Sequence, residues 1–399
     1  MASDPPSRNR LLSRRRALHL CLGTATCLAG AVIQRKMPLA IQRRSSVYNN
    51  REFVVNDQAL LRDRAAAKGI LYGAEINYQQ LSADADLAAQ FVQECALLVE
   101  GGGLKWFLTP SPLRPAPNAF DFTAADWMLR FSQTNQVKMR GHTLVWHQSL
   151  PPWFKETVSN RNAEQVMYDH IQTVAGRYRG QMHSWDVVNE AIWVQDGRPD
   201  GLRKSPWLEF LGPNYVELAF RITAEMDPNA KLVYNDFGLE FGSKESDTKR
   251  ESVLQLLSTL ISKGTPVHAL GLQGHLDTTR SIDSGKLRNF LADVAALGLE
   301  IFITELDVTD QFLPADAEMR DRGVASVYED FLSIVLDEPR VTVVTTWGLS
   351  DRYTWLSEFF PRSDGLPVRP LPLDADLNRK LAWNAIARAF DNAPSRTII

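Results

Sequence analysis

Short apolar runs alternate with longer amphipathic segments along the chain from about residue 65 onward. The apolar runs predict buried strands at 69–75, 104–109, 137–146, 184–189, 231–236, 269–275, 300–307 and 341–348. The segments that follow them have helical spacing and predict helices at about 84–100, 123–135, 162–178, 214–226, 248–263, 284–297, 315–336 and 378–390. Continuous apolar strands that alternate with helices are typical of a parallel sheet covered by helices. Eight such units predict an α/β fold of the (β/α)8 TIM-barrel class in a single domain, with a doubly wound sheet as the alternative.

Most of the predicted strands end in polar or aromatic side chains. These are Lys105, His142, Trp146, His147, Asn189, Glu190, Asn235, Asp236, Gln273, His275, Glu305, Asp307 and Trp347. A strand that buries Val, Ile and Leu has no structural need for a carboxylate at its end. In a barrel the carboxyl ends of all strands converge on one face, where active sites form. We therefore expect these side chains, although far apart in sequence, to meet at one pocket.

Two carboxylates among these strand ends stand out as candidates for chemistry. Glu190 and Glu305 lie 115 positions apart, so only the fold can bring them together. A pair of carboxylates across a pocket suits cleavage of a glycosidic bond. One of them protonates the leaving oxygen, and the other attacks the anomeric carbon or activates a water molecule.

Several neighbours of the two carboxylates are suited to supporting roles. His275 and Asp307 are placed to orient Glu305 and to keep it ionised, because a hydrogen-bonded cationic partner favours the charged form of a carboxylate. Asn189 is placed to donate a hydrogen bond to a sugar 2-hydroxyl, where bonds strengthen in the transition state. Trp347 and Trp355 are candidates for the apolar floor and wall of the pocket.

The composition narrows the other classes of function. The net charge of −3 lacks the basic excess of a nucleic-acid-binding protein, and three cysteines cannot form a disulfide scaffold or a four-cysteine zinc site. The histidines and acids at the strand ends lack an H-E-x-x-H or H-x-H metal motif, so we expect neither a metal ion nor another cofactor. No nucleophile elbow, P-loop or dinucleotide fingerprint occurs. Ten tryptophans, several near the motifs, favour stacking of sugar rings.

The first residues predict an export signal. An arginine-rich stretch that includes Arg14, Arg15 and Arg16 precedes the uncharged apolar run 17–33, as in twin-arginine signals. We assign 1–31 to the signal, 32–60 to a linker and 61–395 to the barrel, which predicts a secreted or periplasmic protein. An uncleaved membrane anchor is the alternative, and no other membrane partner is expected. Removal of the signal leaves Cys95 as a single, buried cysteine.

Together, these strand-end motifs resemble glycoside hydrolase family 10, the endo-β-1,4-xylanases. The resemblance runs from about residue 65 to 391 and rests on the stretches Arg140–His147, Trp185–Glu190, Gly271–His275, Ile303–Asp307 and Trp347–Trp355. It implies a retaining mechanism with Glu190 as acid/base and Glu305 as nucleophile. It also implies that the sugar around the cleaved bond is held by Lys105, His142, Trp146, Asn189, Gln273, His275, Trp347 and Trp355.

The sequence departs from the family pattern in two places. Gly101 and Gly102 replace a Glu-Asn pair that usually binds the second sugar on the non-reducing side, and Glu100 is a substitute only if the loop shifts by one residue. Phe237 replaces a Tyr, so its ring can stack on a sugar without a hydroxyl. Both changes concern substrate binding rather than the carboxylate pair, and the two glycines predict weaker binding at the second sugar.

The leading hypothesis is therefore a secreted, retaining endo-1,4-β-xylanase-like hydrolase that acts on internal β-1,4 bonds of xylan. We expect a monomer. A related β-glycosidase for short xylo-oligosaccharides or another β-linked glycan is the alternative, motivated by Gly101 and Gly102. A glycan-binding barrel without activity would require a lost carboxylate, whereas Glu190 and Glu305 are both present.

Overall fold

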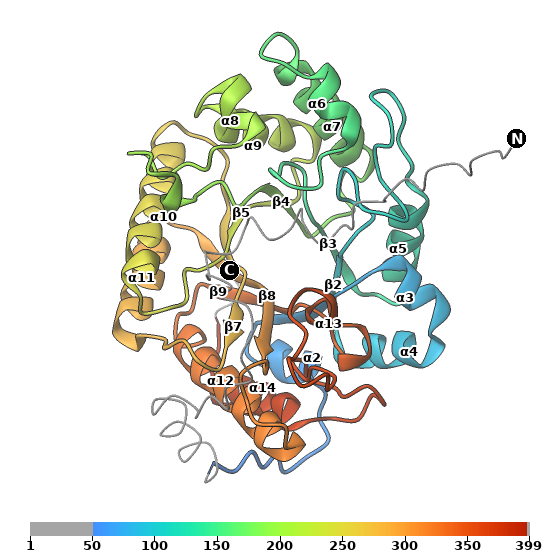
Figure 1. The fold of residues 1–399 in the computed structure, drawn as a ribbon, viewed down its shortest axis with the longest axis vertical. Coiled ribbons are helices and arrows are strands. Elements are labelled where there is room, and N and C mark those ends of the chain that lie inside the picture. The colour runs from blue at the N-terminus through green and yellow to red at the C-terminus, as the bar shows by residue number, and fades with distance from the viewer. Residues whose placement is uncertain (1–50, 397–399) are drawn as a thin grey trace, which may run out of the picture. The chain divides into compact units, whose positions relative to one another are not determined.

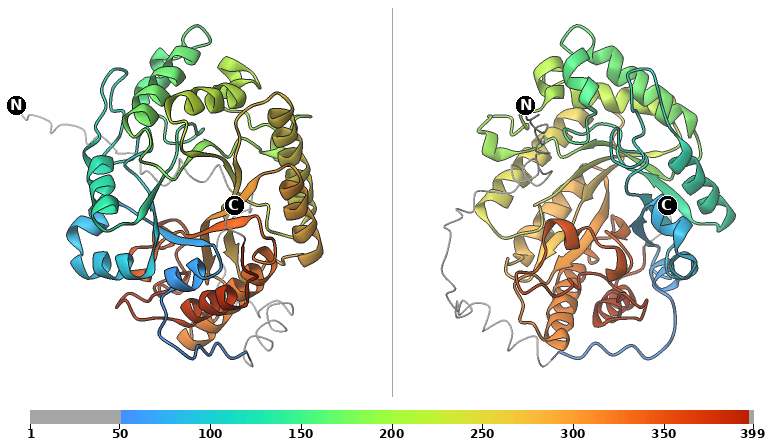
Figure 2. Two further views of the ribbon diagram at one scale, coloured as in Figure 1. Left: turned by 180° about the vertical axis from the view of Figure 1, so that it is seen from behind. Right: turned by 45° about the vertical axis from the view of Figure 1, so that its right-hand side comes forward.

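Parallel strands form a closed barrel at the centre of the structure, a computed structural model that describes residues 51–396. Helices surround the strands as an outer ring (Figures 1 and 2). The strands are β1 (Leu71–Ile76), β2 (Leu97–Glu100), β3 (Lys138–Gly141), β4 (Ser184–Asn189), β5 (Lys231–Asp236), β6 (Ala269–Leu272), β7 (His275–Asp277), β8 (Glu300–Thr309) and β9 (Val341–Thr346). This arrangement confirms the predicted (β/α)8 barrel and excludes the doubly wound sheet.

The order of the strands around the barrel follows the chain. Each strand from β1 to β6 pairs in parallel with the next, β6 pairs with β8, and β9 pairs with both β8 and β1. The short strand β7 is an extension that pairs only with the end of β8, where His275 lies opposite Asp307. The barrel proper therefore has eight strands, and the residues that follow them reach one common face.

Helices cover the outside of the barrel between successive strands. The longer ones are α4 (Ala85–Glu94), α5 (Thr123–Thr134), α7 (Ala163–Arg177), α9 (Tyr215–Met226), α10 (Lys244–Ser262), α11 (Ser284–Ala296), α12 (Ala317–Val335) and α14 (Leu381–Asn392). The shorter ones are α2 (Leu61–Ala66), α3 (Tyr78–Ala83), α6 (Pro152–Thr157), α8 (Pro206–Leu211) and α13 (Leu356–Phe359), with 3-10 turns η2 (Val194–Asp196) and η3 (Asp351–Tyr353). No helix within residues 51–396 is both long and apolar enough to cross a membrane.

The hydrophobic core has two layers because successive side chains of a strand point to opposite faces. Inside the barrel a small cluster comprises Leu97, Val233, Ala269, Phe302 and Val343. The alternate side chains belong to the large cluster between strands and helices. Cys95 is buried, as predicted. The interior cluster closes the barrel below the polar side chains and makes the carboxyl ends of the strands the place for a pocket.

The position of the second strand was predicted wrongly. The sequence placed it at 104–109, whereas β2 is Leu97–Glu100, inside the segment predicted to be one helix at 84–100. Leu97, Leu98 and Val99 continue the apolar positions of α4, so periodicity alone does not mark the end of the helix. The 104–109 segment is apolar because Trp106 is buried at the mouth of the barrel, where its Nε1 donates a hydrogen bond to the carbonyl of Leu144 at 2.7 Å.

The third predicted strand, 137–146, also ends earlier than expected, at Gly141. The following residues remain attached to β4, because the Leu144 and Val145 amides donate to the carbonyls of Asp186 and Val187 at 3.0 Å. The predicted signal at 1–31, with Arg14, Arg15 and Arg16, and most of the predicted linker 32–60 lie outside the described residues.

Candidate active site

Glu190 and Glu305 meet at the carboxyl-terminal face of the barrel, where a chain of amide side chains connects them. Asn235 at the end of β5 donates from Nδ2 to Glu305 Oε1 at 2.7 Å and to Asn189 Oδ1 at 2.9 Å. The Nδ2 group of Asn189 in turn lies 3.3 Å from Glu190 Oε1. Neighbouring parallel strands therefore bring together carboxylates that are far apart in sequence.

The backbone at Glu190 holds its side chain over the pocket. The residue follows directly after β4 and has a φ of 59°, in the left-handed region that few residues other than glycine adopt. Its amide donates to the carbonyl of Asn235 at 2.8 Å, and its own carbonyl accepts from Arg203 Nε at 2.8 Å. These two bonds keep the strained turn in place, so the carboxylate is preorganised.

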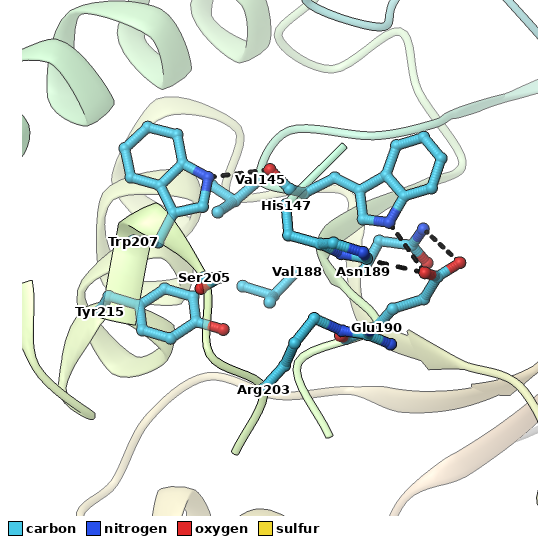
Figure 3. Close-up of a pocket in the computed structure, with 10 residues that line it drawn as sticks. Val145, His147, Val188, Asn189, Glu190, Arg203, Ser205, Trp207 and Tyr215 are labelled. Carbon is cyan, nitrogen blue, oxygen red and sulfur yellow. Dashed lines mark hydrogen bonds and ion pairs between the residues drawn. The ribbon is translucent and has the colours of Figure 1, made fainter. Parts of the chain in front are cut away.

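The carboxylate of Glu190 has donors on both oxygens. Trp146 Nε1 donates to Oε2 at 3.0 Å, and Gln273 Nε2 donates to Oε1 at 3.1 Å. Figure 3 shows Glu190 with Asn189, His147 and Arg203 around it. Burial and the charge of Arg203 lower the pKa of His147 to about 3, so this ring, 3.9 Å from Glu190 Oε2, is uncharged at neutral pH.

Glu305 has a different environment, formed by a relay of three side chains. His275 Nε2 lies 3.2 Å from Glu305 Oε2, and the Nδ1 atom of the same ring lies 2.9 Å from Asp307 Oδ1. Trp355 Nε1 donates to the other Asp307 oxygen at 2.7 Å. The structure thus places His275, Asp307 and Trp355 in contact around Glu305.

This relay fixes the charge of the site. Burial alone lowers the pKa of His275, but the carboxylates of Asp307 and Glu305 outweigh burial and hold it well above 6.5. Burial alone raises the pKa of Glu305, but the hydrogen bond from His275 and the electrostatic effects of His142, His275 and Lys105 outweigh burial and lower the pKa from 4.5 to about 2. The protonated imidazole donates from both nitrogens, and Glu305 is an ionised carboxylate over the ordinary pH range.

A buried ion pair positions His142 beneath the pocket. The Nδ1 atom of His142 donates to Asp186 Oδ2 at 2.7 Å, and Arg140 pairs with the other oxygen of Asp186. All three side chains are buried. The ring of His142 packs edge-on against the ring of Trp347, with 5.3 Å between ring centres. The Arg140–Asp186 ion pair therefore also supports the position of that indole.

Aromatic rings and cations line the rest of the face. The ammonium of Lys105 lies 5.5 Å from the ring centre of Trp146 and 5.7 Å from that of Trp347. Phe237 follows β5, and the Lys249 ammonium lies 3.8 Å from its ring centre. Lys105, Trp146, Trp347 and the Glu190–Glu305 pair therefore share one site, and Phe237 lies beside it, beyond β5.

Sequence reasoning missed several residues of this site. Asn235 was noted only as a polar strand end, yet it contacts both Asn189 and Glu305. Thr304 fixes the Asn235 amide by donating from Oγ1 to its Oδ1 at 2.6 Å. Asp186 and Arg140 were quoted only within motifs. The feature that could have identified Asp186 and Arg140 is a charged residue within an otherwise apolar predicted strand.

Glu100 precedes the two glycines at the pocket, and its carboxylate is occupied by the loop itself. Its carboxylate is 1% exposed and accepts the backbone amides of Gly102 at 2.9 Å and Leu104 at 3.1 Å. It stabilises the loop that carries Lys105, so this carboxylate is used within the protein.

Within residues 51–396, no group of three or more His, Cys, Asp or Glu side chains is arranged to hold a metal ion. The chemistry available at this face is that of two carboxylates in different environments, one hydrogen-bonded by neutral donors and one held by a cationic imidazole. Acid, base and nucleophilic roles are open to them, and aromatic rings frame the space where a ligand would bind.

The chain is similar to a well-populated family of enzymes. The profile of glycosyl hydrolase family 10 matches residues 60–389. Endo-1,4-beta-xylanase A of Caldicellulosiruptor sp. is 37% identical over 301 residues, which are 70% of this chain and 41% of that protein. Endo-1,4-beta-xylanase B of Paenibacillus barcinonensis is 35% identical over 292 residues, 69% of this chain and 84% of that protein. Native xylanase 10B from Thermotoga maritima superposes with a TM-score of 0.75 at 32% identity, covering 83% of this chain and 98% of that one.

Proposed function

Because this chain belongs to glycosyl hydrolase family 10, we propose that it is an endo-1,4-β-xylanase that cleaves internal β-1,4 bonds of xylan with retention of configuration. The observation that carries the proposal is the unequal environment of the two carboxylates. Glu305 is held ionised by His275, whereas Glu190 is held by the neutral donors Trp146 and Gln273. An ionised nucleophile beside a second carboxyl group is the arrangement that double displacement needs.

The first step uses both groups. Glu305 attacks the anomeric carbon as the bond from that carbon to the leaving oxygen breaks, and the carboxyl group of Glu190 transfers its proton to that oxygen. The sugar is then an ester of Glu305, and Glu190 is ionised. In the second step Glu190 takes a proton from a water molecule, whose oxygen attacks the same carbon and releases Glu305. Two inversions at one carbon give net retention.

The surrounding residues have supporting roles in this proposal. In this proposal His275 and Asp307 keep Glu305 ionised and oriented, and Asn189, whose amide lies 3.3 Å from Glu190 Oε1, donates to the sugar 2-hydroxyl. Lys105, His142, Gln273, Trp146, Trp347, Trp355 and Phe237 hold the sugars on either side of the bond. A polysaccharide is the expected partner, and the reaction requires no cofactor.

Product analysis tests the proposal directly. The protein is incubated with xylan and with xylo-oligosaccharides of defined length, and the products and their initial anomeric configuration are followed by NMR. We expect short β-xylo-oligosaccharides from internal cleavage, with the β-anomer formed first. Initial formation of the α-anomer would contradict double displacement, and inactivity on every xylo-configured substrate would contradict the assigned substrate.

A related β-glycosidase with altered specificity is the second candidate, favoured by Gly101 and Gly102 at the pocket. Such an enzyme would act on short xylo-oligosaccharides or another β-linked glycan. The same assay separates the two candidates. Efficient turnover of xylobiose or xylotriose with little release from xylan would favour the second one.

We also propose that the protein is exported through a twin-arginine signal within residues 1–31 and acts outside the cytoplasm. The support is the arginine-rich stretch followed by the apolar run 17–33. Replacement of Arg14, Arg15 and Arg16 by Lys is expected to leave the protein in the cytoplasmic fraction. Normal export of this variant would indicate the general secretory route or a plain membrane anchor.

A further inference from the structure

A carboxyl group that the proposed mechanism does not use lies at the same face of the barrel. Glu75 is near the end of β1, where it pairs in register with Val99 of β2. Its side chain is half-buried, and within residues 51–396 no hydrogen bond or ion pair to its carboxyl oxygens is formed. The groups that act on it electrostatically are Lys105, Glu100, Glu305 and Asp307, so it faces the site described above.

The space that Glu75 occupies is the space that Gly101 leaves free. A Cβ atom added to Gly101 would lie 1.7 Å from Glu75 Oε1 and 2.7 Å from its Cδ. The backbone of Gly101 is not in the left-handed region, so its conformation would accept other residues. The carboxyl group of Glu75 is therefore what excludes a side chain at position 101. At Gly102 an added Cβ meets only Leu108, at 3.3 Å, and Glu100, at 4.0 Å.

We propose that Glu75 is a substrate-binding residue whose carboxyl group hydrogen-bonds a hydroxyl of the sugar one unit beyond the attacked one, on the side away from the leaving group. The proposal rests on the glycosidase function proposed above. Glu75 thus makes, from β1, a polar contact that the glycines after β2 cannot make. Lys105, in the loop after β2, lies near it.

The direction of the substrate follows from the order of the strands. β1 and β5 are four strands apart in the ring of eight and thus face each other across the mouth of the barrel. Glu190 follows β4, beside β5, and it protonates the leaving oxygen, so the leaving group lies towards β5. The sugars attached to the attacked carbon then extend towards β1 and Glu75.

The contacts around Glu305 indicate which sugar Glu75 would reach. His275 and Asn235 hydrogen-bond Glu305 directly, whereas Glu305 and Asp307 act on Glu75 through their charge, without a hydrogen bond. Glu75 therefore lies outside the ring of groups that surrounds the attacked sugar, and its ligand is the next sugar along.

The protonation of Glu75 suits this role. Burial raises its pKa to about 8, assisted by the negative charges of Glu100, Glu305 and Asp307 and opposed by Lys105. The group is therefore largely an uncharged carboxyl at pH 6–7, able both to donate and to accept a hydrogen bond. It can bind a hydroxyl without adding a negative charge next to the nucleophile.

The test compares two chromogenic substrates, an aryl β-xylobioside, which reaches the second sugar position, and an aryl β-xyloside, which does not. Glu75→Ala is expected to lower kcat/KM about tenfold on the xylobioside, as for the loss of one or two hydrogen bonds, and less than about twofold on the xyloside. Glu75→Gln, which keeps a donor and an acceptor, is expected to retain most of the activity. Glu225→Ala, an exposed carboxylate on α9, is the matched control.

Gly101→Ala gives an independent measurement, because the added methyl must displace the Glu75 carboxyl. Gly101→Ala is expected to lower kcat/KM on the xylobioside by a similar factor. The Glu75→Ala/Gly101→Ala double variant is expected to show no further loss of kcat/KM, because the two positions act through one contact. Equal losses on both substrates, or no loss in either single variant, would overturn the proposal while leaving the glycosidase function intact. A wild-type protein that cleaves neither substrate would remove the function and the Glu75 role together.

Discussion

Replacement of His275 by Ala is the sharpest perturbation of the site, because one side chain determines the charge of Glu305. The ring contacts Glu305 Oε2 at 3.2 Å and is itself held by Asp307. Without the imidazole, burial raises the pKa of Glu305 and is opposed by the hydrogen bond from Asn235 and by the electrostatic effect of His142 and Lys105. We therefore expect the pKa of Glu305 to return at least to its ordinary value of 4.5 from about 2.

The size of the effect follows from this change. At 1.36 kcal/mol per pKa unit, the difference between 4.5 and about 2 corresponds to about 3 kcal/mol of stabilisation of the ionised carboxylate. At pH 4 a carboxyl group with a pKa of 2 is about 99% ionised, and one with a pKa of 4.5 is about one-quarter ionised. Relative to pH 6.5, kcat/KM at pH 4 is expected to fall about fourfold in the variant and hardly at all in the wild type.

The assay is a pH profile of kcat/KM between pH 3.5 and 7 on an aryl β-xylobioside with a good leaving group, for which protonation by Glu190 matters little. Circular dichroism at each pH shows that the protein is folded, and His275→Gln provides a second variant that retains a donor without a charge. His268→Ala is the control, because His268 precedes β6 at the opposite end of the barrel. An unchanged acidic limb in folded His275→Ala would refute the reasoning.

Four further outcomes are expected. Glu305→Ala should lose turnover while remaining folded, and azide should partly restore cleavage of an activated aryl substrate with inverted configuration. Turnover as high in this variant as in the wild type would contradict the assignment of Glu305 as nucleophile. Glu190→Ala should lose about a hundredfold or more on xylan but much less on substrates with good leaving groups, and equal losses on both would count against the acid role. Arg140→Met should lower the free energy of unfolding in urea by about 3–5 kcal/mol, because it leaves the buried Asp186 carboxylate without its cationic partner; a change under 1 kcal/mol would show that pairing with His142 suffices. The Tm of Glu75→Gln minus that of the wild type should increase from pH 5 to pH 8. The Glu75 carboxyl has a raised pKa, so it contributes stability that is complete below pH 4.5 and is lost as the pH rises through about 8, whereas Gln does not titrate. A Tm difference that is independent of pH would contradict the raised pKa.

The sequence by itself determined the architecture and the main chemistry. Continuous apolar runs that alternate with amphipathic helices specify a parallel barrel, and polar residues at the strand ends mark its functional face. Both properties are local, because burial of a strand or of one helix face can be read from the spacing of apolar residues. Glu190 and Glu305 were recognisable because a buried strand has no structural use for a terminal carboxylate.

The tertiary structure decided which side chains meet. Leu97–Glu100 continues the helical pattern of α4, so only pairing with β1 and β3 reveals it as a strand. The double contact of Asn235, the left-handed turn at Glu190 and the placement of Glu75 over Gly101 depend on distances between strands that no local pattern encodes. A glycine in the sequence shows only that a side chain is missing. The fold shows that a carboxyl group from the neighbouring strand fills the space.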